Sequence, residues 1–220
     1  YTATFRIHPK DRYEIADKQI KWIGTEWSFT GGIAQTFNLY TNITNRCNLP
    51  TDHVVSLTDI GNHQIHATYD KKVTLYLGEI FQMRDAIRDE ACGFIHLSKN
   101  ITLEHLNLHF LGNFGIVGQY SENLTYKYLN CEPEYGSGRT CAGFADFAQM
   151  SGCKGKIRII NSRFEGAQDD PINVHGTHLK VIAYEPGNKI VVRFMHPQSY
   201  GFEAFFPGDE VEFTEIHSLQ

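Results

Sequence analysis

No run of about 18 or more apolar residues occurs in the 220-residue chain, so the sequence predicts no helical membrane span. Basic clusters are also missing, because 20 Lys and Arg stand against 25 Asp and Glu for a net charge of -5. Nucleic acids and anionic membrane surfaces are bound through an excess of basic charge, so neither is an expected partner. No charged and then apolar leader precedes Tyr1, so we find no signal peptide and expect a mature product or an internal fragment.

Cysteine is scarce as well. The five cysteines are odd in number and have no CxxC spacing, which argues against a zinc site and allows at most two disulfides. We predict no metal and no other cofactor. Three Asn-x-Ser/Thr sequons, at Asn42, Asn100 and Asn123, could be glycosylation sites, but asparagine at strand starts is the interpretation that we favour.

Helical periodicity is nearly absent. Only Ile80 to Glu90 spaces its apolar residues as a helix would. Before about Asp70 the chain reads as short strands broken by Gly, Asn and Pro turns, such as TATFRIH, QIKWIG and DHVVSLTDI, and Val73 to Leu77 adds another. The sequence therefore predicts an all-β protein.

After Cys92 the sequence repeats. Ile101-Thr102 realigns with Leu124-Thr125, and Leu106-Asn107 realigns with Leu129-Asn130 at the same offset. The Leu-Asn step returns once more as Ile160-Asn161, after a longer interval, because Glu132 to Thr140 is expected to be an inserted loop.

Each repeat has a short alternating strand, an asparagine and a second apolar strand, with no helix between. Asparagine tolerates the left-handed backbone conformation and can form ladders with asparagines above and below it. This pattern predicts a right-handed parallel β-helix over residues 1–176, with 1–70 as accessory strands. An antiparallel sandwich would explain the alternation but not the recurring Leu/Ile-Asn step.

Beyond Gly176 the pattern becomes that of hairpins. HLKVIAY, KIVVRF and DEVEFT are separated by Glu-Pro-Gly-Asn and Phe-Pro-Gly-Asp turns. We expect residues 177–220 to be the start of a small antiparallel β-barrel domain, incomplete in this chain, beside the third repeat.

Three acids mark the candidate site. Asp146 lies in the apolar run GFADF, and Asp169-Asp170 leads into PINV. If Phe144–Phe147 and Pro171–Val174 are neighbouring parallel strands about 4.8 Å apart, the three carboxylates face one bound molecule. Crowded carboxylates cannot all ionise freely, so one keeps a proton while its neighbours stay charged, as glycoside hydrolysis requires.

Other interpretations of these acids remain open. Asp-Asp-Pro is common in turns, and Asp146 could cap a loop. Acids in a β-helix groove can also bind calcium in lyases. Lyase chemistry needs a basic residue beside the acids, and neither Arg158 nor Arg163 is clearly on their strand face.

The run GFADF, the Asp-Asp of the later segment GAQDDPINVHGTHLKV, and the preceding GIVGQYSENLTYK resemble glycoside hydrolase family 110. The resemblance covers about Arg84 to Val181. It implies a bacterial, secreted or periplasmic, inverting and metal-independent exo-α-galactosidase that removes terminal α-1,3-linked galactose from glycans. Pro171 stands where the family has a small residue, and GFADF where Thr-Ala-Asp is usual.

By the same resemblance Asp169 is the general acid, while Asp146 and Asp170 hold and deprotonate the water; the roles of Asp169 and Asp170 could be exchanged. The implied galactose-binding residues are Gln119, Asn173, His175, Arg84 and Arg139. As alternatives, Asn173 could be a ladder residue, His175 a buried donor, and the two arginines solvated loop charges. A non-catalytic glycan-binding β-helix, or another β-helix polysaccharide hydrolase or lyase, is the competing interpretation.

Overall fold

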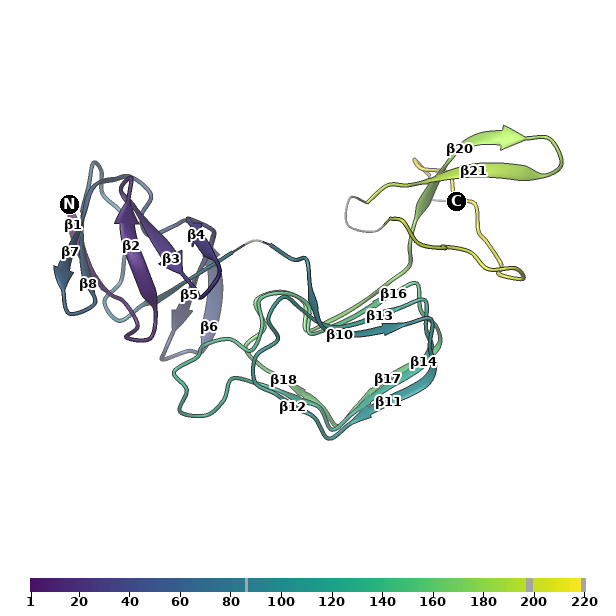
Figure 1. Ribbon diagram of the computed structural model, residues 1–220, viewed down its shortest axis with the longest axis horizontal. Coiled ribbons are helices and arrows are strands. Elements are labelled where there is room, and N and C mark those ends of the chain that lie inside the picture. Colours follow the sequence, from purple (N-terminus) through teal and green to yellow (C-terminus); the bar gives the residue numbers. More distant parts are fainter. Residues whose placement is uncertain (86, 197–199, 219–220) are drawn as a thin grey trace. The chain divides into compact units, whose positions relative to one another are not determined.

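The computed structural model describes residues 1–85, 87–196 and 200–218. These residues form 21 strands and no helix, which confirms the all-β class (Figure 1). The chain divides into two compact units, Tyr1–Asp89 and Glu90–Gln220, each described by itself below. The predicted boundaries at residues 70 and 176 stay predictions.

The first unit contains three antiparallel sheets of three strands each. Their orders are β1-β8-β7, β2-β3-β4 and β6-β5-β9. The strands are β1 (Thr2–Arg6), β2 (Arg12–Ala16), β3 (Gln19–Ile23), β4 (Ser28–Thr30), β5 (Ile33–Asn38), β6 (Ile43–Cys47), β7 (Val54–Gly61), β8 (Gln64–Tyr69) and β9 (Ile80–Arg84).

Tight turns determine the pairing of these strands. Asp17 and Lys18 have φ of 49° and 61° between β2 and β3, and Asn62 and His63 both have φ of 54° between β7 and β8. Two consecutive positive φ angles match the twist of antiparallel strands. The hairpins bring Ile7, Ile20 and Ile65 together as the buried core of this unit.

Two local predictions are wrong in this unit. Ile80–Arg84 is not helical but pairs antiparallel with β5, since a partner strand outweighs a helical spacing of only three apolar residues. The described residues of the rest of that segment form no helix, and Ala86 lies outside the described residues. Val73–Leu77 is not a strand either.

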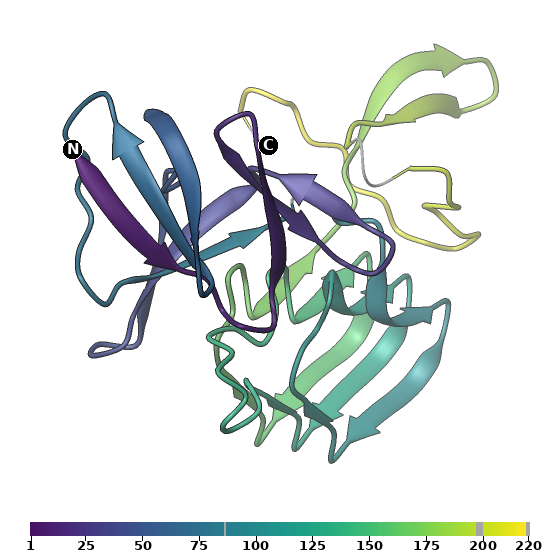
Figure 2. The same cartoon turned by 60° about the vertical axis from the view of Figure 1, so that its left-hand side comes forward.

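The second unit contains three parallel sheets. The first has β10 (Ala91–His96), β13 (Phe114–Gln119), β16 (Ala148–Ser151) and β19 (Ile172–His175). The second has β11 (Lys99–Glu104), β14 (Glu122–Lys127) and β17 (Lys154–Ile160), and the third has β12 (Asn107–Leu108), β15 (Asn130–Cys131) and β18 (Arg163–Phe164). The chain visits the three sheets in turn, so successive passes stack on one another (Figures 1 and 2).

The register tests the predicted repeat. Ile101 pairs with Leu124, which confirms the offset between the first two passes. Asn130 pairs with Arg163 rather than with Asn161, so the alignment predicted for the next pass is wrong. Asn161, with φ of 48°, has instead the left-handed conformation of Tyr128 and His105 in the passes before it.

An asparagine ladder does form, at another bend. Asn123 donates from Nδ2 to Asn100 Oδ1 at 3.1 Å, and both residues have φ of 57°. In the third pass Gly155 has φ of 73°, and Lys156 donates its backbone N–H to Asn123 Oδ1 at 2.9 Å. Two of the three sequon asparagines are therefore structural partners at strand starts.

The core of the second unit lies between the three sheets. Leu111, Leu124, Tyr126, Leu129 and Met150 are almost completely buried there. Each such aliphatic side chain contributes roughly 1.5–3 kcal/mol when it leaves water. Partly buried residues of the first and third passes, such as Leu103 and Ile159, cover this core from both sides.

The chain ends in a hairpin and a segment without strands. β20 (Leu179–Glu185) pairs antiparallel with β21 (Lys189–Phe194) across a turn at Gly187 and Asn188. The strand expected at DEVEFT is absent, so that prediction is wrong. The Phe202 ring lies 4.8 Å from the rings of both Tyr120 and Phe194, joining this segment to the end of β13 and to β21.

All five cysteines lie in the described ranges and are thiols. Within the same ranges, no helix has the length and apolar character that crossing a membrane requires.

Candidate active site

The structure brings the three predicted acids together. Asp146, Asp169 and Asp170 each offer a carboxylate oxygen, and these oxygens lie within 4.8 Å of one another. Ala148 pairs with Ile172, so Asp146 and Asp170 each stand just before neighbouring parallel strands, β16 and β19. The acids lie in the loops that enter these strands, and the expectation of a strand at Phe144–Phe147 is wrong.

This loop position explains how adjacent acids serve one site. On a regular strand Asp169 and Asp170 would point to opposite faces. Both precede β19, where the chain bends, and the backbone N–H of Asp170 donates to Asp169 Oδ1 at 3.2 Å. Both carboxylates can therefore join that of Asp146.

The backbone around Asp146 is held by the ladder of the parallel sheet. Gly115 donates its N–H to the Asp146 carbonyl at 2.8 Å, and Phe147 donates to the Asp170 carbonyl at 3.2 Å. A Cβ at Gly115 would lie 2.2 Å from the Phe147 carbonyl oxygen, so only glycine permits this approach. Ala145 and Phe147, both 1% exposed, anchor Asp146 on either side.

The three carboxylates differ in exposure. Asp146 is 5% exposed and accepts a hydrogen bond on Oδ2 from Asn173 Nδ2 at 2.9 Å. Asp169 is half-buried and Asp170 is exposed. One constrained carboxylate thus stands beside two that solvent or a substrate can reach, an arrangement suited to acid/base chemistry on a bound molecule. Carboxylate oxygens are also ligands that Ca²⁺ takes, so the cluster is equally the place where a hard cation would bind.

Comparison with known proteins identifies relatives along nearly the whole chain. The α-1,3-galactosidase A of Bacteroides thetaiotaomicron is 49% identical over 214 residues, which is 97% of this chain and 38% of the relative. The α-1,3-galactosidase A of Streptomyces avermitilis is 39% identical over 94% of this chain and 35% of its own length. The α-1,3-galactosidase B of Parabacteroides distasonis is 35% identical over 98% of this chain and 35% of its own length.

Over nearly its whole length the chain is thus similar to proteins named α-1,3-galactosidase. The resemblance drawn from GFADF and the Asp-Asp segment is thereby confirmed. In addition, the family model of the GLAA-B β-barrel domain II matches residues 189–220. The chain spans 35–38% of the length of these three relatives.

Two of the five residues predicted to bind galactose lie on β19, the strand that follows Asp169 and Asp170 in the chain. Asn173 and His175 are both on β19, and Asn173 is paired in register with Gln149 of β16. His175 Nδ1 lies 2.9 Å from the Gly176 carbonyl oxygen, which only accepts, so Nδ1 carries the proton. His175 Nε2 lies 3.2 Å from Gln149 Nε2.

Gln149 is the residue that sequence reasoning missed. It is half-buried on β16, between Asn173 in register and the His175 ring. The register that relates Ala148 to Ile172 also relates Gln149 to Asn173, but this register is known from the strand pairing and not from the sequence.

The other three candidates have separate settings. Gln119 is half-buried on β13 and is in register with Ser151, which pairs with His175, so it lies two strands from that histidine. Arg139 lies over the Phe110 ring, with its guanidinium carbon 4.4 Å from the ring centroid. Arg84 belongs to β9 of the first unit and donates to the Asp85 carbonyl at 3.3 Å.

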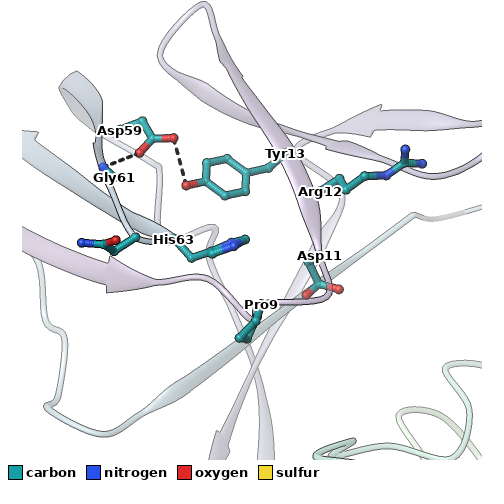
Figure 3. A pocket seen from close by; sticks show the side chains of 8 residues that line it. Pro9, Asp11, Arg12, Tyr13, Asp59, Gly61 and His63 are labelled. Carbon is teal, nitrogen blue, oxygen red and sulfur yellow. Dashed lines mark hydrogen bonds between the residues drawn. The ribbon is translucent and has the colours of Figure 1, made fainter.

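The first unit has a hollow of about 550 Å³ that is open to solvent (Figure 3). The residues that line it lie between Pro9 and His63, so none of the three acids belongs to it. Tyr13 donates from its hydroxyl to Asp59 Oδ2 at 3.0 Å, and Gly61 N–H donates to Asp59 Oδ1 at 2.7 Å. Burial and, after it, the Asp59 carboxylate raise the pKa of Tyr13. Both oxygens of Asp59 therefore have partners within the protein.

Proposed function

We propose that the protein hydrolyses terminal α-1,3-linked galactose from glycans, as an inverting exo-α-galactosidase that uses Asp146, Asp169 and Asp170. The observation that carries this proposal is the meeting of the three carboxylates at the entry of two neighbouring parallel strands. The names of the relatives supply the substrate class.

The proposal includes the architecture. The three parallel sheets, visited in turn by each pass of the chain, support a right-handed parallel β-helix. The β20-β21 hairpin and the family match over residues 189–220 support the start of a small β-barrel domain.

In the proposed reaction Asp169 protonates the departing glycosidic oxygen. Asp146 and Asp170 hold a water molecule and remove its proton as the oxygen attacks the anomeric carbon, so that the proton donated by the acid is balanced by one taken up by the base. The difference in exposure supports the separate role of Asp146, because Asp169 and Asp170 can both reach a substrate while Asp146 is constrained by Asn173. Exchange of Asp169 and Asp170 would leave the scheme otherwise unchanged.

The distance between the acids bears on the anomeric configuration of the released galactose, so that configuration tests the proposed mechanism. Inverting enzymes usually separate the two carboxyl groups by about 6.5–9.5 Å, and retaining enzymes by about 5–5.5 Å. Oxygens within 4.8 Å favour retention on this criterion alone, whereas the family resemblance implies inversion. Inversion at this spacing requires that two carboxylates hold the water together on one side.

Substrate contacts complete the proposal. His175 and Gln119, on the sheet that carries β16 and β19, are proposed to bind galactose hydroxyls, with Gln149 beside them. Arg139, of the inserted loop, is a further candidate for a substrate contact, and the scheme requires no metal. We propose that the protein is bacterial and is secreted or periplasmic.

The test is to incubate the full-length protein with p-nitrophenyl α-galactoside and with an α-1,3-galactobiose, and to follow the released anomer by proton NMR. Release of β-galactose supports the scheme. Release of α-galactose would contradict inversion and make one of the acids a nucleophile. Binding without release would favour the glycan-binding alternative.

A further inference from the structure

One hydrogen bond of the acid cluster reaches between neighbouring strands. Asn173 of β19 donates from Nδ2 to Oδ2 of Asp146, which precedes β16, at 2.9 Å. Asn173 is half-buried and Asp146 is 5% exposed. The contact is therefore largely withdrawn from water, where a hydrogen bond to a charged group is stronger than at the surface.

The direction of this bond constrains the chemistry of Asp146. An amide nitrogen donates and cannot accept, so Oδ2 must be the acceptor in the pair. A proton on Oδ2 would have to displace the amide, and a proton on Oδ1 would make Oδ2 a weaker acceptor. The contact therefore favours the charged carboxylate and fixes the rotation of the group.

From this geometry we infer that Asn173 is a positioning residue, which holds Asp146 as an oriented carboxylate and makes it a proton acceptor rather than the general acid. The inference rests on the proposed function and deepens it. The expectation that Asn173 binds galactose stays a prediction, because the amide has a second N–H and a carbonyl oxygen besides the N–H that Asp146 accepts.

Kinetics of Asn173→Ala and Asn173→Asp distinguish the two roles. Loss of the donor should lower kcat by roughly 10- to 100-fold, as for a misplaced catalytic group, and change KM by less than about two-fold. Asn173→Asp should be slower still, because it opposes two carboxylates at hydrogen-bonding distance. A rise in KM at constant kcat, equal in both variants, would overturn the inference in favour of a galactose ligand.

Exchanging the amide of residue 173 and the carboxylate of residue 146 tests their contact by thermal stability, independently of enzymatic activity. Asn173→Asp should lower the midpoint of thermal unfolding by roughly 2–4 °C. Adding Asp146→Asn restores an amide opposite a carboxylate and should recover most of that loss, while activity stays low because residue 146 can no longer accept a proton. A double variant no more stable than Asn173→Asp would show that the two residues are not coupled.

The control is Asn107→Ala, an exposed asparagine on β12 outside the sheet of the site, which should leave kcat, KM and the midpoint unchanged. If the unmodified protein releases no galactose, the proposed function fails. The exchange experiment still decides whether Asn173 positions Asp146.

Discussion

At the scale of single residues, the candidate site depends on different surroundings for three chemically identical side chains. Asp146 is buried and bonded to Asn173, whereas Asp169 and Asp170 are more accessible. Identical groups take different roles when their environments differ. The sequence was enough to predict that these three acids form one site. It could not predict the Asn173 contact, because that contact depends on how the loop before β16 bends.

The first prediction concerns Asp169. Asp169→Asn removes the transferable proton of the proposed acid, so kcat should fall by roughly 10²- to 10⁴-fold. Circular dichroism and the unfolding midpoint should stay unchanged. Glu134→Gln, which alters an exposed acid of the inserted loop, is the matched control, and a near-normal rate for Asp169→Asn would remove this residue from the acid role.

A second prediction concerns Tyr126. Its hydroxyl is buried in the core and has no hydrogen-bond partner among the described residues. Such a group costs about 1–3 kcal/mol, so Tyr126→Phe should raise the free energy of unfolding by roughly 1 kcal/mol in urea titrations. A clear loss of stability would mean that the hydroxyl is hydrogen-bonded.

The same tyrosine predicts alkaline behaviour. Burial raises the pKa of Tyr126 from 10.0 to about 12. A pKa raised by folding means that the contribution to stability is fully present below the unfolded pKa of 10.0 and is lost as pH rises through about 12. Tyr126→Phe should reduce this loss without abolishing it, because burial also raises the pKa of Tyr69 to about 12.

At the scale of elements, register rather than composition places the acids. Matching apolar pairs correctly predict the sequence offset between the first and second passes. The offset predicted between the second and third passes is wrong. The sequence aligned Asn161 with Asn130, but the left-handed position that Asn161 occupies is held by Tyr128 and His105 in earlier passes. Three different residue types occupy this left-handed position in the three passes. The sequence therefore could not show where the third pass resumes after the inserted loop.

The third prediction belongs to this scale. At Gly115 a new Cβ would meet the carbonyl oxygens of Phe147 at 2.2 Å and Asp146 at 2.8 Å, so Gly115→Ala must shift the backbone that carries the acid. We expect a loss of roughly 1–3 kcal/mol in unfolding free energy and a marked fall in kcat. Gly112→Ala, with nothing within 4 Å of its Cβ, is the control. Equal behaviour of the two variants would contradict the close approach.

At the scale of the whole molecule, the all-β class and the family could be recognised from the sequence, while the division into two units could not. The split falls after Asp89, where the sequence shows no conspicuous linker. The helix expected over Ile80–Glu90 was wrong because antiparallel pairing with β5 supplied hydrogen bonds that a short helix would have had to provide alone.

The fourth prediction concerns metal dependence of the entire protein. The proposed scheme moves protons through the three carboxylates and gives no step to a cation. Dialysis against EDTA should therefore leave the rate of galactoside hydrolysis unchanged. Loss of activity that calcium restores would support the calcium-dependent lyase alternative.

The order of the first parallel sheet has a consequence for heat resistance. β19 is its last strand within the described residues, paired only with β16, whereas β13 and β16 are flanked on both sides. An edge strand opens at lower cost than an interior one. In the 220-residue chain the amide hydrogens of β19 should therefore exchange with deuterium before those of β13, and warming should loosen Asp169 and Asp170 from Asp146 before the interior strands open.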